Sequence, residues 1–199
     1  MSENIHPIFD SILSRVDKEK MLRQRACVLW MVGLSGSGKS TLAKGLEQAL
    51  HEKGYLTALL DGDNLRSGIN NNLGFSEEER FENIRRAAEA SKLLANNGLI
   101  TICSLISPTS KIRSMAAGIL GDLYAEIHIN CPVEVCEERD VKGLYAKARR
   151  GEIKNFTGID APFEIPESPA LRVDTAENDL ETSLNQLLAF VLPRINYDK

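Results

Sequence analysis

The sequence is poor in aromatic residues and has no long apolar run. Aromatic side chains make up 6% of the 199 residues, so large rings that stand outside the core attract attention. No apolar segment approaches the roughly 20 residues that a membrane-spanning helix needs, and residues 1–25 hold no apolar core of signal-peptide length. We therefore expect a cytoplasmic protein with no membrane partner.

The sequence also lacks the spacing of a zinc or disulfide framework. No C-x-x-C pair occurs, and the histidines share no ligand spacing, which argues against a metal cluster and against a catalytic histidine. Two of the cysteines lie inside apolar runs, so free and mostly buried thiols are expected, as in a reducing compartment. The residues concerned are Cys27, Cys103, Cys131, Cys136, His6, His51 and His128.

An excess of basic residues is missing as well. The formal net charge of −4 argues against a general nucleic-acid-binding protein, so cations that bind phosphate must be concentrated locally, and one such concentration follows residue 139. With 43% hydrophobic residues, the chain can bury a sizeable core, but it is too short for two full α/β domains. One compact enzyme domain is expected.

A complete phosphate-binding loop of the pattern G-x-x-x-x-G-K-[ST] is present. It consists of Gly33, Leu34, Ser35, Gly36, Ser37, Gly38, Lys39 and Ser40. In this pattern backbone N–H groups surround phosphate oxygens, the lysine reaches the β- and γ-phosphates, and the hydroxyl can ligate Mg²⁺. An apolar run precedes the loop and a helical pattern that ends near Gly54 follows it, so a chance glycine-rich turn is the weaker interpretation.

Strand-like and helical segments alternate along the chain, which favours a parallel sheet covered on both faces. Strands are expected over 26–32, 55–60, 99–106, 125–130 and 171–174, and helices over 8–24, 76–98 and 178–192. The predicted fold is α/β, of the three-layer P-loop NTPase type, with a five-stranded parallel sheet flanked by helices. We expect residues 1–25 to form a helical N-terminal extension and residues 26–199 to form the P-loop domain, in which the polar region 142–170 is predicted to be a mobile, lid-like loop.

Polar residues follow the predicted strands, at the edge where parallel sheets bind ligands. Asp61 and Asp63 suit Mg²⁺ positioning and acceptance of a proton from an attacking hydroxyl, or they cap a turn. Nearby arginines could form a second anion site or pair with glutamates on a helix surface. They are Arg66, Arg80, Arg85 and Arg86, with Glu77, Glu78 and Glu82 as the alternative partners.

Several motifs, in order, resemble those of the adenylylsulfate kinase family over about residues 26–192. They are Gly33–Thr41, the segment DGDNLR at 61–66, LGFS at 73–76, ENIRR at 82–86, ISP at 106–108, CEERD at 136–140, KGLY at 142–145 and FTGID at 156–160. The DGDN and FTGI segments are far more specific than the phosphate loop. The resemblance implies transfer of the ATP γ-phosphoryl group to the 3′-hydroxyl of adenosine 5′-phosphosulfate (APS), with Mg²⁺, in a homodimer.

The resemblance also implies a role for each matching residue. Gly33 to Thr41 and Arg139 would bind ATP, Lys39 would contact the transferred group, and Ser40 and Asp61 would hold the metal. Asp63 would accept the proton, and Ser107 matches a serine discussed as a phosphoenzyme site, although direct transfer is our hypothesis. The residues implied in APS binding are Asp63, Arg66, Phe75, Arg80, Asn83, Ile106, Ser107, Lys142, Leu144 and Phe156, with Phe75 and Phe156 on the two faces of the adenine.

The sequence departs from the family pattern at residues 109–113 and at Val141, where proline is common. Two rival interpretations remain at this point. A kinase of the same fold could act on another small acceptor, such as a nucleotide or a sugar acid. A GTP-binding switch would share the phosphate loop, but the sequence has no Asn-Lys-x-Asp segment to read guanine.

Overall fold

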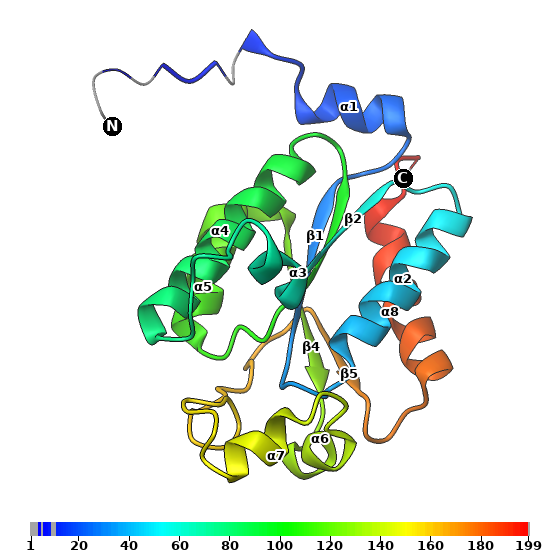
Figure 1. The fold of residues 1–199 in the computed structure, drawn as a ribbon. Helices are drawn as coiled ribbons and strands as arrows, with labels where there is room; N and C mark the ends of the chain where they lie inside the picture. Colours follow the sequence, from blue (N-terminus) through cyan, green and yellow to red (C-terminus); the bar gives the residue numbers. More distant parts are fainter. Residues whose placement is uncertain (1–3, 5, 9–10, 199) are drawn as a thin grey trace.

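The computed structural model describes residues 4, 6–8 and 11–198 and contains a five-stranded parallel sheet (Figure 1). The strand order is β2-β3-β1-β4-β5, and all four neighbouring pairs are parallel. The strands are β1 (Cys27–Val32), β2 (Thr57–Asp61), β3 (Ile100–Ser104), β4 (Tyr124–Asn130) and β5 (Leu171–Asp174). The predicted fold class is confirmed, and each predicted strand is present with boundaries that shift by at most two residues.

Helices cover both faces of the sheet, which gives three layers (Figure 1). On one face, α2 and α8 bury leucine and valine side chains against β1, β3 and β4; on the other, α4 and α5 pack against β1 and β3. Every residue of β1 and β3 is buried, which explains the continuous apolar sequence of β1 and the mostly apolar sequence of β3. The main helices are α1 (Arg15–Leu22), α2 (Lys39–Glu52), α3 (Gly62–Ser67), α4 (Glu77–Ala95), α5 (Ser110–Leu120), α6 (Val133–Arg139), α7 (Leu144–Arg149) and α8 (Leu180–Ile195).

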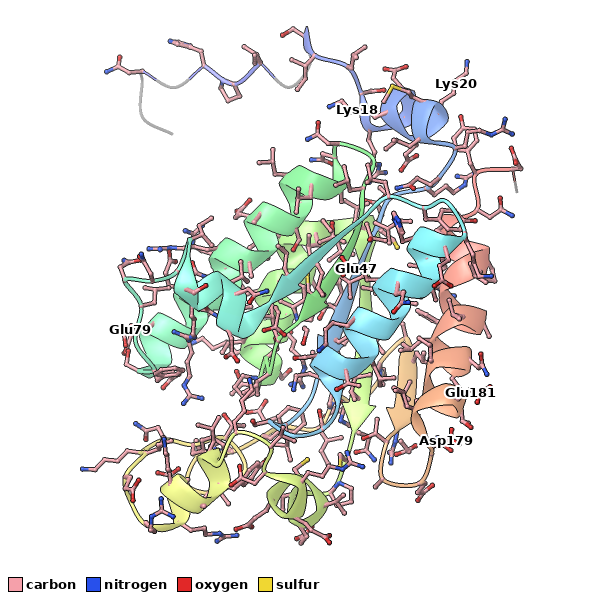
Figure 2. All side chains as sticks on the ribbon, turned by 45° about the vertical axis from the view of Figure 1, so that its right-hand side comes forward. Lys18, Lys20, Glu47, Glu79, Asp179 and Glu181 are labelled. Atoms are coloured by element: carbon pink, nitrogen blue, oxygen red, sulfur yellow. The ribbon has the colours of Figure 1, made fainter. Side chains whose placement is uncertain are left out.

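The start of α4 is fixed by a capping box. The Ser76 side chain accepts a hydrogen bond from the Glu79 amide, and the Glu79 carboxylate accepts one from the Ser76 amide. The same carboxylate accepts a further bond from the Gly74 amide at 2.8 Å. Figure 2 shows Glu79 in the first turn of α4, on the outside of the molecule. One side chain thus anchors both the helix and the loop that enters it.

Some elements differ from the sequence-based expectation. The helix expected over 8–24 is shorter, because α1 begins at Arg15 after the cap Ser14; residues 9–10 lie outside the described residues. The helices α3, α5 and α6 were not predicted. The region 142–170, predicted as a loop, contains the six-residue helix α7 and is otherwise made of turns and irregular backbone.

Gln24 joins the segment after α1 to the amino ends of two strands. Its fully buried side chain donates to the carbonyls of Leu56 and Gly98, at 2.9 and 2.8 Å, and accepts from the Leu56 amide at 2.8 Å. Gln24 also forms an isolated antiparallel bridge with Asn196. This amide therefore connects the N-terminal segment, the sheet and the end of the chain.

Two sequence-based expectations concern the thiols and the membrane. Cys27, Cys103, Cys131 and Cys136 are all buried and free, as predicted. Within the described part of the chain, no helix combines the length and apolar character needed to cross a membrane.

Candidate active site

The phosphate loop lies between β1 and α2, and close backbone packing requires glycine in it. A Cβ atom on Gly33 would lie 2.5 Å from the Ile129 carbonyl oxygen, and one on Gly36, at φ +76°, would lie 2.8 Å from that of Cys136. The loop leads directly into α2, whose first residue is Lys39. Backbone amides beside a helix N-terminus are suited to binding an anion, so phosphate binding by this loop stays a prediction.

Lys39 is buried inside this loop. Its ammonium group donates to the Leu34 carbonyl at 2.7 Å and lies 3.5 Å from the Ser37 hydroxyl. Burial lowers the pKa of Lys39 to about 8, and the negative charges of Asp61 and Asp63 act against that lowering. Lys39 therefore remains mostly charged at pH 7, and a phosphate beside it would favour the charged form further.

Ser40 and Asp61 form the predicted metal position. The Ser40 hydroxyl donates to Asp61 Oδ2 at 2.7 Å and lies 3.2 Å from the Ser104 hydroxyl. Burial acts to raise the pKa of Asp61, but the hydrogen bonds from Ser40 and from the Asp63 amide outweigh it and keep that pKa below its usual value. A carboxylate between hydroxyl groups is a donor set of hard oxygens, which fits Mg²⁺.

Asp61 also caps α3, because its Oδ1 accepts a hydrogen bond from the Asp63 amide at 3.0 Å. The capping interpretation of this aspartate is therefore confirmed, and its role as a metal ligand stays a prediction. Asp63 projects outward and forms an ion pair with Lys142, which precedes α7. The side chains of Asp63 and Lys142 are 71% and 58% exposed, so this contact contributes little to stability and can be exchanged for a contact with a ligand.

Arg66, Arg80 and Phe75 form a second group beside Asp63. The guanidinium carbon of Arg66 lies 4.2 Å from the centroid of the Phe75 ring, and Arg66 also donates to the Leu73 and Gly74 carbonyls. The Phe75 residue is 62% exposed, although its class of side chain is usually buried. An exposed ring held by a cation is suited to stacking on a flat ligand.

Arg80 connects this group to the Phe156 segment. It donates to the Phe75 carbonyl at 2.8 Å, to the Thr157 hydroxyl at 2.9 Å and to the Asn155 carbonyl. Phe156 packs edge-on against Tyr145, with ring centroids 4.9 Å apart. The structure thus brings together the two phenylalanine segments, which lie some 80 positions apart in the chain.

The other predicted residues lie near this edge in differing environments. Asn83 is buried one turn after Arg80, and its side-chain oxygen accepts from Asn70 at 3.0 Å. The Ile106 carbonyl accepts from the Gly33 amide at 3.4 Å, and Leu144 begins α7. Ser107 is buried, and its hydroxyl accepts from the Trp30 indole at 3.0 Å. Arg85 and Arg86 both pair with Glu82, so the surface interpretation is the right one for these two arginines.

Arg139 reaches the phosphate loop through a residue that the sequence analysis missed. It donates to the Thr175 carbonyl at 2.6 Å and lies 3.5 Å from the Gly36 carbonyl. The Thr175 hydroxyl donates to the Ser37 carbonyl at 2.8 Å. Thr175 directly follows β5, so the rule that ligands gather at strand ends could have found it. Tyr145, which donates to the Ser35 carbonyl at 2.9 Å, was missed as well.

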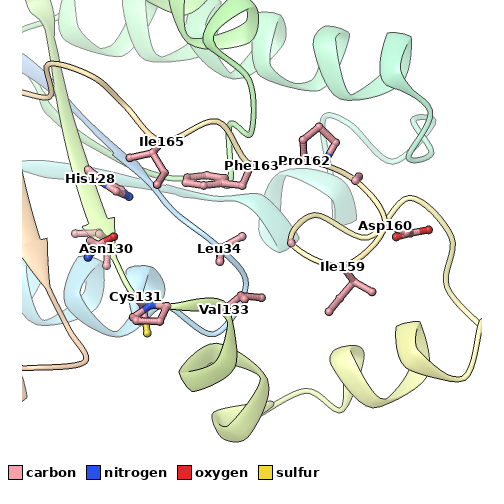
Figure 3. Close-up of a pocket in the computed structure, with 14 residues that line it drawn as sticks. Leu34, His128, Asn130, Cys131, Val133, Ile159, Asp160, Pro162, Phe163 and Ile165 are labelled. Carbon is pink, nitrogen blue, oxygen red and sulfur yellow. The ribbon is translucent and has the colours of Figure 1, made fainter.

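A cavity of about 600 Å³ is lined by Leu34 of the phosphate loop, by the end of β4 and by the segment 158–165. Leu34 and the end of β4 form one side, and Ile159, Phe163 and Ile165 lie across from them (Figure 3). His128 lines the cavity and lies 6.0 Å, between ring centroids, from Phe163. The segment still contacts the loop beside this cavity, because a Cβ atom on Gly158 would lie 3.0 Å from the Leu34 side chain, and Ile159 and Phe163 pack against the core cluster that contains Leu34.

The strand order, the phosphate loop after the central strand and the cluster of cations and carboxylates at the same edge define a P-loop protein of the kinase class. The sequence model of the family described as adenylylsulphate kinase matches residues 25–174. The chain belongs to this family.

Named relatives agree with this assignment. An adenylyl-sulfate kinase of Bacteroides fragilis is 61% identical over 196 residues, covering 98% of this chain and 97% of the relative. One of Phocaeicola vulgatus is 62% identical over 192 residues, covering 96% and 94%. The solved Mycobacterium tuberculosis APS kinase in complex with AMPPNP and APS is 42% identical, with a TM-score of 0.81, over 84% of this chain and 98% of that one.

Proposed function

We propose that the protein transfers the γ-phosphoryl group of ATP to the 3′-hydroxyl of APS and forms 3′-phosphoadenosine 5′-phosphosulfate. The observation that carries this proposal is the meeting, at one sheet edge, of a phosphate loop with a pair of phenylalanine segments joined by Arg80. A solved relative holds an ATP analogue together with APS. A GTP-binding switch has no acceptor nucleotide that the phenylalanine pair could bind. The acceptor of a sugar-acid kinase has no purine that could stack on this pair.

The donor nucleotide would bind along the phosphate loop. Gly33 to Thr41 supply backbone amides, Lys39 neutralises the transferred phosphate, and Arg139 lies where it can cover the base. Ser40 and Asp61 would hold Mg²⁺, which supplies charge neutralisation at the phosphates. The remaining positions around that ion would be filled by phosphate and water oxygens.

The acceptor would bind between the phenylalanine segments. Phe75 and Phe156 would stack on its adenine, while Arg66, Arg80 and Asn83 would bind its phosphosulfate group. Ile106, Lys142 and Leu144 would complete the pocket. The exposure of Phe75 supports this arrangement, because a ring that is 62% exposed costs free energy in water that a stacked purine recovers.

Transfer would be direct. The 3′-oxygen attacks the γ-phosphorus, the bond between that phosphorus and the β,γ-bridging oxygen breaks, ADP leaves, and Asp63 takes the proton of the hydroxyl. A loose transition state of this kind needs positioning and charge neutralisation more than covalent help. Ser107 is only 1% exposed, and its oxygen is already hydrogen-bonded by Trp30, which supports direct transfer over a phosphoserine intermediate.

The region 142–170 would act as a lid over the acceptor. The cavity beside residues 158–165 leaves this region room to move. The ion pair of Lys142 with Asp63 and the hydrogen bond from Arg80 to Thr157 are contacts that the region could exchange as it closes. The helix α7 would move with this lid as a short rigid piece.

A homodimer and a cytoplasmic location complete the proposal. Apolar side chains of the N-terminal segment stand exposed, among them Ile12, Leu13, Val16 and Met21, and a second copy of the chain would cover them. Four free, buried thiols fit a reducing compartment.

The decisive experiment incubates the purified protein with ATP, Mg²⁺ and APS and follows 3′-phosphoadenosine 5′-phosphosulfate by chromatography. Product should form with ATP, should fall strongly with GTP, and should be lost when EDTA removes the metal. Gluconate and adenosine 5′-monophosphate serve as competing acceptors. Faster phosphorylation of either compound than of APS would overturn the proposal.

A further inference from the structure

Ser107 has an unusual backbone conformation for its residue type. Its φ is +46°, and only two other non-glycine residues in the described part of the chain, Arg23 and Asn155, have a φ in the left-handed region. Arg23 is the C-cap of α1, a place where such a conformation is ordinary. Ser107 follows a buried strand and is itself buried, so surrounding groups must hold it in this disfavoured state.

Two buried side chains hold Ser107 from different elements. The Trp30 indole of β1 donates to the Ser107 hydroxyl oxygen at 3.0 Å, and Arg113 of α5 donates to the Ser107 carbonyl at 3.2 Å. An indole nitrogen can only donate, so the serine keeps its own proton for another acceptor. The two bonds therefore fix both the peptide and the direction of the hydroxyl group.

The two holding residues are themselves connected. Arg113 Nε lies 3.5 Å from Glu126 Oε2, and the Tyr124 hydroxyl donates to the same carboxylate oxygen at 2.8 Å. The Tyr124 ring lies 6.1 Å from that of Trp30, between centroids, which closes a ring of contacts back to Ser107. A buried ion pair adds little net stability, so fixing a conformation is the better account of its presence.

The position of this ring ties it to the active site. Ile106, the neighbour of Ser107, accepts a hydrogen bond from Gly33, the first residue of the phosphate loop. On the other side, the Glu164 amide donates to the Pro108 carbonyl at 2.8 Å, which links the same turn to the region 142–170. The turn 106–108 therefore lies between the donor loop and the proposed lid.

We propose that Trp30, Arg113 and Glu126 are positioning residues that hold Ile106 and Ser107 in the conformation that the acceptor nucleotide requires. The proposal rests on the proposed function. A small displacement of a substrate-contacting turn lowers the population of the reactive geometry without touching the reacting atoms. Loss of these contacts should weaken binding of the acceptor nucleotide. Binding of ATP should stay unchanged, because ATP would be bound by the amides of Gly33 to Thr41.

The test measures the KM values for APS and for ATP separately. Trp30→Phe keeps an aromatic side chain but removes the N–H donor, and it should raise the KM for APS about tenfold while the KM for ATP stays within about twofold. Met31→Leu, one residue further on the opposite face of the sheet, is the control and should change neither value. Equal changes in both KM values, or no change for APS, would overturn the proposal.

A second pair of variants tests the arginine that holds the same turn. Arg113→Lys should raise the KM for APS in the same way, and the double variant Trp30→Phe with Arg113→Lys should raise it by less than the two single effects combined, because both changes release one turn. Losses that simply add would contradict a positioning role. Where Arg113→Lys fails to fold, the Trp30→Phe result decides.

The wild-type protein separates the two proposals. If it does not phosphorylate APS, the proposed function fails before any variant is made. If it does, and the KM values do not separate in the variants, only the positioning role fails.

Discussion

Lys39 and Asp63 show how differently two charged residues of one site are placed. Lys39 is buried among backbone carbonyls, whereas the Asp63 side chain is 71% exposed and paired with Lys142. The first arrangement fixes a charge where the donor phosphates would lie. The second leaves a carboxylate free to exchange its partner for a hydroxyl group, which suits a proton acceptor.

Asp63→Asn should lower kcat by about 10² to 10⁴, because the amide cannot accept the proton of the attacking hydroxyl. The KM for ATP should change little, since the phosphate loop is untouched. Steady-state rates of APS phosphorylation at saturating ATP measure the effect. Glu52→Gln at the exposed end of α2 serves as the charge-matched control, and a near-normal kcat for Asp63→Asn would exclude it from the mechanism.

Among single residues, the candidate site residues that could be predicted from the sequence are those whose position follows from local spacing. Asp61 could be placed because it ends a strand, and Lys39 because it belongs to a loop with a fixed pattern. The role of Trp30 could not be predicted. Its apolar neighbours indicate a buried strand, but its hydrogen-bond partner Ser107 lies 77 positions further along the chain.

At the scale of elements, one arginine joins two loops and a helix. Arg80 lies in the first turn of α4 and bonds both the Phe75 carbonyl before the helix and the Asn155–Thr157 segment. The capping box of Ser76 and Glu79 fixes the direction of that first turn. The separation of the two proposed stacking rings is therefore set by the start of one helix.

Arg80→Met should raise the KM for APS about tenfold or more, because charged hydrogen bonds to both ring segments are lost. The KM for ATP should stay within about twofold. Arg85→Met, which removes a half-exposed ion pair to Glu82 on the same helix, is the matched control and should leave both values unchanged. Michaelis–Menten analysis with each substrate varied in turn checks this, and a parallel rise in both constants would count against the assignment.

The elements that the sequence failed to predict are short or lie in polar regions. α7 has six residues and follows Gly143 at φ +66°, so neither length nor a capping side chain marked it. α5 carried a readable signal, with Thr109 as its cap and Ile112, Ala116 and Leu120 on its buried face. The strands were easier, since β1 is a continuous apolar run and the other strands are short segments rich in aliphatic residues, as is typical of buried parallel strands.

For the whole molecule, His128 links stability to pH. Its side chain is buried, and its Nδ1 has no hydrogen-bond partner in the described part of the structure. Burial lowers the pKa of His128 to about 4, helped by the positive charges of Arg172 and Arg113 and opposed by Asp174. The unfolded chain binds a proton near pH 6.5, so the folded state loses stability as the pH falls from there towards 4.

His128→Phe should remove this dependence. At pH 5 the buried His128 should lower the unfolding free energy of the wild type by about 2 kcal/mol relative to its value near neutral pH. The adjoining cavity gives room for the larger phenylalanine ring. As the pH falls from 6.5 to 4, the unfolding free energy of the variant should rise steadily relative to that of the wild type, as measured by urea unfolding at several pH values. His51→Gln on the surface of α2 is the control, and parallel pH curves for wild type and His128→Phe would refute the assignment.

The proposed dimer is a second property of the whole molecule. Sedimentation velocity should show a concentration-dependent shift from monomer to dimer. Leu13→Glu with Val16→Glu should displace the equilibrium towards monomer, because two exposed apolar side chains of the proposed contact become charged. Leu180→Glu, at another exposed leucine, on α8, should not; an unchanged dimer in the first variant would place the interface elsewhere.

The Gln24 side chain has a consequence for any shortening of the protein. A chain that starts at Ala26 would keep every residue of the proposed active site, yet it would lose the three hydrogen bonds to Leu56 and Gly98. The amino ends of β2 and β3 would then fray, and their amide protons would exchange with deuterium faster than in the full-length chain. Removal of the first 25 residues would thus loosen the sheet at its amino end, which lies opposite to the proposed active site.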